Sequence, residues 1–149
     1  MNRARLMFVI AGLASAPLPA LAEEDAAAAQ EGPTSYACEF NTGASWSFDA
    51  GKFTSKEPAS LKFTIDNVDL DAQHAILKGA EGAEPGNIAI ARASGANHFL
   101  EVATAGYWNI TTIYDKDAAS GLYPAVHSRH FGLVGQPVFS QYAGTCTGK

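Results

Sequence analysis

The chain has 149 residues, of which 47% are hydrophobic, and it carries 10 Lys and Arg against 15 Asp and Glu. The resulting formal charge of −5 argues against a nucleic-acid partner, because phosphate binding needs clustered positive charge. Adsorption to an anionic membrane surface is disfavoured for the same reason.

The first 22 residues have the three-part pattern of a secretory signal peptide. Arg3 and Arg5 form a short basic start, residues 6–14 are apolar, and Ala-Leu-Ala at 20–22 is a small-residue cleavage signature. A membrane span would need about 20 apolar residues, and two prolines interrupt this segment. The sequence therefore predicts a periplasmic or secreted protein with no stable membrane anchor.

Removing the predicted signal peptide leaves 149 − 22 = 127 residues, enough for one domain. Its balance of 8 basic and 15 acidic residues gives a formal −7, which would attract a cationic partner. Residues 23–34 are acidic and alanine-rich, and they predict a flexible leader. Residues 35–149 are expected to form a single β domain.

From residue 35 onward, short apolar-polar alternations are separated by Gly, Asp, Asn and Pro about every eight to twelve residues, a pattern typical of an antiparallel all-β domain. About eight or nine strands and one or two helical turns are expected. Turns are predicted at 49–51, 66–69 and 94–97, and loops at 79–86 and 115–121. The segments with a strand pattern are residues 35–40, 45–49, 52–55, 61–65, 73–78, 88–91, 98–104, 107–114, 123–131 and 137–142.

The exported chain has two cysteines, Cys38 near its start and Cys146 near its end. An even, minimal count in an exported protein predicts one disulfide, and two separate thiols are the alternative. Such a bond makes the first and last strands neighbours. It therefore favours a small closed antiparallel barrel over a two-sheet sandwich.

His127 and His130 are the most conspicuous candidates for metal chemistry. They lie in a predicted strand, where side chains three residues apart point to opposite faces. His127 is expected to share a face with Tyr123 and Arg129, so a two-histidine metal site would need a bulge. His98 is a further candidate ligand, but no spacing requires a metal or a cofactor.

Arg129 needs a carboxylate or several carbonyls if its face points inward. Glu101 in a neighbouring strand is the expected partner, followed by Asp115, and such a polar cluster in a barrel mouth would suit a small anionic ligand. A surface salt bridge is the alternative. The two tryptophans and four phenylalanines are expected in the core: Trp46, Trp108, Phe48, Phe63, Phe99 and Phe139.

Ser120-Gly121-Leu122-Tyr123 closes an acidic loop, and it is similar to the S-G-x-x-Y type loop of the periplasmic inhibitors of c-type lysozyme, with one residue fewer. Those inhibitors are eight-stranded barrels whose loop enters the lysozyme cleft. The resemblance therefore implies an inhibitor that acts through residues 115–123, with Asp115 and Asp117 facing the cationic enzyme. The family's second loop motif has no counterpart that we can place in this sequence.

The segments AVHSRH and SQYAGTC also look like small exported bacterial proteins of unknown function, a resemblance that implies no activity. The expected function is that of a non-enzymatic barrel of the bacterial envelope, which binds a protein or a small-molecule ligand. The alternatives are lysozyme inhibition, a metal-binding or hydrolytic protein that uses His127, His130 and His98, and a purely structural protein. The expected ligand-binding residues are Tyr123, His127, Arg129, Asp115, Asp117 and Ser120.

Overall fold

The computed structural model describes residues 32–79, 84–103, 106–131 and 136–149, which form nine β-strands and no helix. The predicted signal peptide, residues 23–31 of the predicted leader and part of the predicted 79–86 loop lie outside these ranges. No helix long and apolar enough to cross a membrane occurs in the described ranges. The strands are β1 (Tyr36–Asp49), β2 (Lys52–Lys56), β3 (Leu61–Asp69), β4 (His74–Lys78), β5 (Gly86–Ala93), β6 (Ala96–Ala103), β7 (Tyr107–Tyr114), β8 (Tyr123–Phe131) and β9 (Val138–Gly148).

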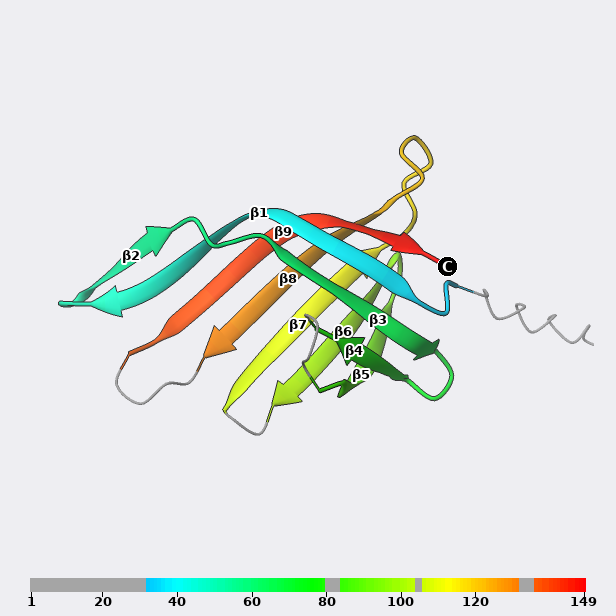
Figure 1. Ribbon diagram of the computed structural model, residues 1–149, viewed down its shortest axis with the longest axis horizontal. Coiled ribbons are helices and arrows are strands. Elements are labelled where there is room, and N and C mark those ends of the chain that lie inside the picture. The colour runs from blue at the N-terminus through cyan, green and yellow to red at the C-terminus, as the bar shows by residue number, and fades with distance from the viewer. Residues whose placement is uncertain (1–31, 80–83, 104–105, 132–135) are drawn as a thin grey trace, which may run out of the picture. The chain divides into compact units, whose positions relative to one another are not determined.

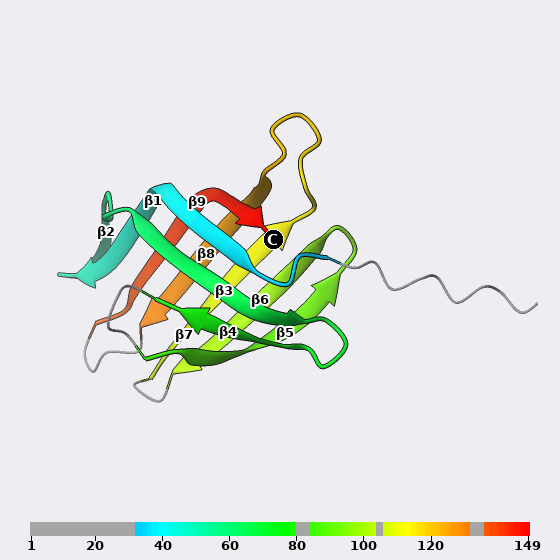
Figure 2. The ribbon, with the colours of Figure 1, turned by 45° about the vertical axis from the view of Figure 1, so that its right-hand side comes forward.

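Eight of these strands close into an antiparallel barrel in the order β1-β3-β4-β5-β6-β7-β8-β9, and β9 pairs back with β1 (Figures 1 and 2). The long strand β1 has different neighbours along its two halves. Residues 36–40 pair with β3, residues 45–49 pair with β2, and β9 runs beside both halves. The predicted barrel is confirmed, and β2 extends its wall as a hairpin with β1.

The β1–β2 hairpin turns at Ala50 and Gly51, which both have positive φ (47° and 81°). Two-residue hairpin turns that match the twist of paired strands require such φ values. The turn predicted at 49–51 is therefore confirmed. The residues before it were expected to form two strands, 35–40 and 45–49. They form one, because a register shift between Phe40 and Thr42 lets β1 continue through a bulge.

Two glycines permit a close approach of β1 and β9 beside this bulge. A Cβ added at Gly43 would lie 2.5 Å from the carbonyl oxygen of Gln141, and one added at Gly144 would overlap the backbone of Glu39 and Phe40. Glycine is therefore required at these positions because the gap between the two backbones is too narrow for a Cβ atom, and not because the backbone has a positive φ.

Gly144→Ala should destabilise the fold by about 1–3 kcal/mol, the usual penalty for forcing atoms into a packed site. Gly86→Ala is the matched control, because its Cβ would find only the Glu101 carboxylate at 3.8 Å. Urea denaturation of both variants checks the prediction. Equal midpoints for the two alanine variants would contradict it.

The reversal predicted at 66–69 is wrong. β3 continues to Asp69 through a register shift, at which Asn67 takes a positive φ of 52°, and the chain turns at residues 70–73 instead. Asn and Asp are common in turns because they tolerate the left-handed backbone conformation. The same conformation is also found at β-bulges, and Asn67 adopts it at the register shift.

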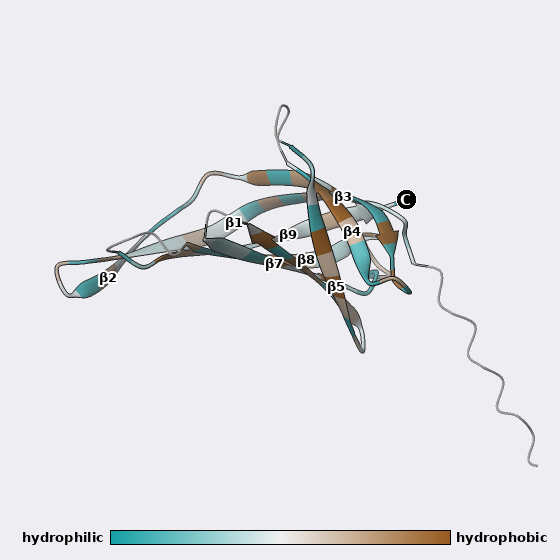
Figure 3. Ribbon diagram, turned by 90° about the horizontal axis from the view of Figure 1, so that it is seen from below, coloured by the Kyte–Doolittle hydropathy of each residue, from teal (hydrophilic) through white to brown (hydrophobic). Residues whose placement is uncertain are grey.

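The core fills the barrel with the inward-facing residues of every second position, and β3 and β5 show this alternation of brown and teal in Figure 3. Phe63 and Phe99 lie in the core as expected. The core placement of both tryptophans and of Phe48 and Phe139 is wrong. Trp108 is 44% exposed, and Trp46, Phe48 and Phe139 are only half-buried. The parity of their strands assigns these rings to the outer face.

The ends of the domain are tied together outside the strands. The Thr34 amide donates to the carbonyl oxygen of Lys149 at 2.8 Å, and the Val68 amide donates to the carbonyl of Thr34 at 2.9 Å. Residues 32–34, placed in the leader by sequence, are thus attached to the barrel.

Candidate functional site

Cys38 and Cys146 form a disulfide that joins β1 to β9, and the two residues lie directly opposite each other in the ladder. The predicted pairing is confirmed, and it links residues 108 positions apart at the seam where the barrel closes. The described residues include no free cysteine. The seam is a structural site rather than a chemical one.

The loop of residues 115–121 projects from the barrel between β7 and β8 (Figure 1). Within it, the Asp117 carboxylate accepts hydrogen bonds from the hydroxyl and the amide of Ser120, at 2.6 and 2.7 Å. These bonds lower the pKa of Asp117 below its ordinary value, and the bond from the hydroxyl has the larger effect. The Asp115 amide donates to the carbonyl of Gly95 at 3.0 Å. Asp117 and Ser120 therefore define the shape of the loop.

Tyr123, His127 and Arg129 share the inward face of β8, as predicted. They do not converge, since six residues of strand separate Tyr123 from Arg129 by about 20 Å. Tyr123 lies at the loop end, where its ring packs edge-on against Tyr36 at 5.3 Å. The pKa of Tyr36 is raised to about 12, mainly because the ring is buried and to a smaller extent because Tyr123 is near. The predicted binding residues thus divide between the two ends of the barrel.

His127 is 3% exposed and lies midway along the barrel. Its Nδ1 and the Thr111 hydroxyl are 2.8 Å apart, and its ring is surrounded by those of Phe40, Phe63 and Tyr142. Burial, followed by repulsion from Arg129, lowers the pKa of His127 to about 4. A hydroxyl beside an imidazole is the geometry of a nucleophile and its base. Here both groups are buried among aromatic rings, and the pair serves the core.

A row of polar side chains crosses the inner face of five neighbouring strands at the end of the barrel away from the 115–121 loop. We call it the inner polar row, and its members in spatial order are Glu101 (β6), Asn109 (β7), Arg129 (β8), Ser140 (β9) and Ser45 (β1). Each member lies directly opposite the next in the strand register, so neighbouring Cβ atoms are about 4.5–5.5 Å apart. Solvent reaches the row at Glu101 and Arg129, which are half-buried, whereas the other three are buried.

Hydrogen bonds join the row at its two ends and leave its centre open. The Asn109 amide donates to the Glu101 carboxylate, and the Ser140 hydroxyl donates to that of Ser45 at 2.9 Å. Between them, Asn109 Oδ1 and Arg129 Nε are buried without a hydrogen-bond partner among the described residues. The Arg129 guanidinium lies over the ring of Phe131, 5.1 Å from its centre. One unpaired acceptor and one unpaired donor therefore lie on adjacent strands.

Glu101 was expected to pair directly with Arg129, but β7 lies between their strands and places Asn109 between the two side chains. The ion pairs of the described ranges are Glu39–Lys62 and Asp66–Lys78, both on the outer face. Asn109, Ser45 and Ser140 were missed as site residues. The available signal was an asparagine, a poor strand former, in the middle of the strongest predicted strand.

His127 and His130 point to opposite faces, as the strand period predicted. His130 stacks on Trp108 outside the barrel, at 5.2 Å between ring centres, and His98 contacts the Thr112 hydroxyl on the same outer face. No group of three metal-ligating side chains occurs within the ranges that the structure covers. The fold therefore separates the histidines proposed for a metal site.

A shallow depression of about 490 Å³ lies on the outer face across β1, β3, β9 and the end of β4. Its cations, Lys62 and Lys78, are paired with Glu39 and Asp66 at 2.8 Å each. The inner polar row is the stronger candidate. It contains buried polar atoms without a hydrogen-bond partner among the described residues, whereas the charged groups of the depression are exposed and already paired.

Comparisons of the chain with family models, with curated proteins and with solved structures returned no match. The function is therefore inferred from the sequence and the geometry.

Proposed function

We propose that the protein is an exported, non-enzymatic binding protein of the bacterial envelope, periplasmic or secreted, that holds a small polar ligand against the inner polar row. Export is supported by the signal-peptide pattern of residues 1–22 and by the disulfide, because disulfides persist mainly in oxidising compartments. Binding is supported by one observation, the unpaired pair of Asn109 Oδ1 and Arg129 Nε.

Buried polar atoms are nearly always hydrogen-bonded, and leaving one unsatisfied costs about 1–3 kcal/mol. Asn109 Oδ1 needs a donor, and the Arg129 Nε–H needs an acceptor. A single hydroxyl group can satisfy both, since it donates one hydrogen bond and accepts two. A hydroxylated molecule, such as a sugar or a hydroxy acid, therefore fits the pair better than a simple carboxylate, which offers acceptors only.

The Arg129 Nε–H and the Asn109 side-chain amide each give their own signal in a nitrogen–proton correlation spectrum, which provides a direct test. We expect N-acetylglucosamine, glucose, glycerol or lactate to move both signals saturably, and acetate to bind less well, because it leaves Asn109 Oδ1 unpaired. Arg129→Lys keeps the charge but removes the Nε–H, and it should abolish saturation.

His130→Gln is the matched control, because it changes the outer face of the same strand. It should leave the titration unchanged. If no probe moves either signal and both groups show contacts to a bound water instead, the row is a hydrated structural feature and the proposed function is wrong.

A further inference from the structure

Four aromatic side chains form a continuous stack on the outer face of the barrel. The rings of this outer aromatic stripe, Trp46, Phe139, His130 and Trp108, come from β1, β9, β8 and β7 in spatial order. Successive ring centres are 4.9, 6.5 and 5.2 Å apart, with planes 13°, 17° and 28° from parallel. Val102 extends the stripe onto β6 and is 79% exposed.

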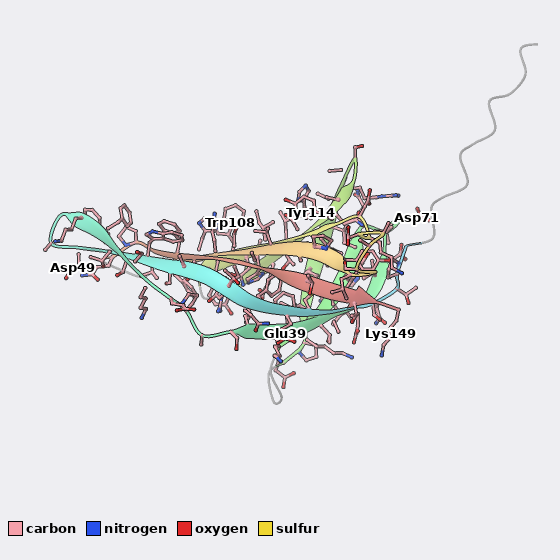
Figure 4. The ribbon with its side chains drawn as sticks, turned by 90° about the horizontal axis from the view of Figure 1, so that it is seen from above. Glu39, Asp49, Asp71, Trp108, Tyr114 and Lys149 are labelled. Carbon is pink, nitrogen blue, oxygen red and sulfur yellow. A yellow bond between two sulfur atoms is a disulfide. The ribbon has the colours of Figure 1, made fainter. Side chains whose placement is uncertain are left out.

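The outer face that bears this stripe carries no charged side chain on four strands. β6 to β9 contain two charged residues within their bounds, Glu101 and Arg129, and both belong to the inner polar row. The outward positions hold aromatic, aliphatic, imidazole, hydroxyl and amide groups. Figure 4 shows Trp108 and Tyr114 projecting on the same side of β7, and Tyr114 is 45% exposed.

The opposite wall of the barrel differs. The outer face of β3, β4 and the first half of β1 carries Glu39, Lys62, Asp66 and Lys78 in two ion pairs. The chain has 15 acidic and 10 basic residues, but none of them lies on the outer face of β6 to β9. Exposed apolar patches larger than a few hundred Å² mark interaction surfaces.

We propose that the charge-free outer face of β6 to β9, with Trp46 of β1, is the interface of a symmetric homodimer. The acidic chain repels its own copies over most of its surface, and this face is where two copies can meet without juxtaposed like charges. A two-fold axis brings the same patch of each copy together, and two sheets pack face to face about 10 Å apart.

The size of the face is sufficient for such a dimer. Five strands about 4.8 Å apart and seven residues about 3.3 Å apart cover roughly 24 by 23 Å, or about 550 Å² of flat area. Two copies together therefore bury at most about 1,100 Å², which clears the roughly 1,000 Å² expected of a biological interface. A membrane surface fits less well, because interfacial segments combine an apolar face with Lys and Arg, which the outer face of β6 to β9 lacks.

Sedimentation velocity of the disulfide-bonded protein from about 1 µM to about 300 µM tests the proposal. We expect the mass to rise from monomer to dimer over this range. Both tryptophans of the chain lie in the outer aromatic stripe, so their fluorescence should shift to shorter wavelength as the dimer forms.

Gln141→Glu is the sharpest variant, because it adds one charge at nearly constant shape to the outer face of β9, between Ser128 of β8 and Ala44 of β1. It should weaken dimerisation roughly tenfold or more, since a two-fold axis brings two carboxylates into one interface. Gln73→Glu is the matched control, because it makes the same exchange at an exposed turn position between β3 and β4, outside the face. It should leave the dimer unchanged, and unfolding curves of both variants check that the fold persists.

Two results would overturn the proposal: a monomer at every concentration, or equal weakening by the two glutamates. A monomer that cosediments with vesicles of phosphatidylglycerol and phosphatidylethanolamine, and is released by Gln141→Glu, would assign the face to a membrane instead. None of these readouts depends on the inner polar row or its ligand.

Discussion

Removing the disulfide with Cys38→Ala and Cys146→Ala should lower the free energy of unfolding by about 4–5 kcal/mol. The bond joins residues 108 positions apart, so cutting it releases nearly the whole β domain in the unfolded state. In the folded state the same two residues remain neighbours in the β1–β9 ladder. The loss therefore arises mainly from the unfolded ensemble.

Urea denaturation measures this loss, and it offers a second sign of its origin. The free energy of unfolding should fall more steeply with urea concentration than in the parent, because a chain without the cross-link exposes more surface on unfolding. Ser45→Ala with Ser140→Ala is the control, since it removes a directly opposed, hydrogen-bonded pair from the same two strands. A loss below about 0.5 kcal/mol, the size of an ordinary surface change, would count against the prediction.

Acid should destabilise the protein through His127 by about 3 kcal/mol between pH 6.5 and pH 4. Burial lowers the pKa of the folded imidazole from 6.5 to about 4. As the pH falls below 6.5, the unfolded chain binds a proton that the folded chain excludes until about pH 4. The stabilisation is thus complete above pH 6.5 and is lost as the pH falls through this window.

His127→Gln removes this titration and should flatten the dependence of stability on pH by the same amount. Unfolding free energies measured by urea at pH 7, 5.5 and 4 compare the variant with the parent. His74→Gln, at an exposed position of β4, is the control for the loss of a histidine. Parallel pH profiles for the parent and His127→Gln would show that the buried imidazole contributes nothing to acid sensitivity.

Local pattern was sufficient for the strands that carry the site. The expected strands 107–114 and 123–131 coincide with β7 and β8, because runs rich in aromatic and β-branched residues end at clear turns. The same period of two placed His127 and His130 on opposite faces. The count of two cysteines predicted the disulfide, and the disulfide favoured the closed barrel.

Local pattern failed where the role of a residue depends on a neighbouring strand. The continuity of β1 required a bulge, beside which Gly43 of β1 and Gly144 of β9 each lie against the backbone of the other strand. Trp46 and Trp108 were expected inside because they are hydrophobic. The register instead turns Asn109, Thr111 and Ile113 inward and leaves Trp108 outside. A slip of one residue would reverse every such assignment, and no single strand specifies its own register.

The sequence by itself determined an all-β domain of about nine strands, its disulfide, and which residues of a strand share a face. Only the tertiary structure decided which of those faces is inside. Each member of the inner polar row comes from a different strand, and each ring of the outer aromatic stripe does as well. Both features exist only once all the strands pair in register, because side chains from separate strands become neighbours through the hydrogen-bonded ladder and not through the chain.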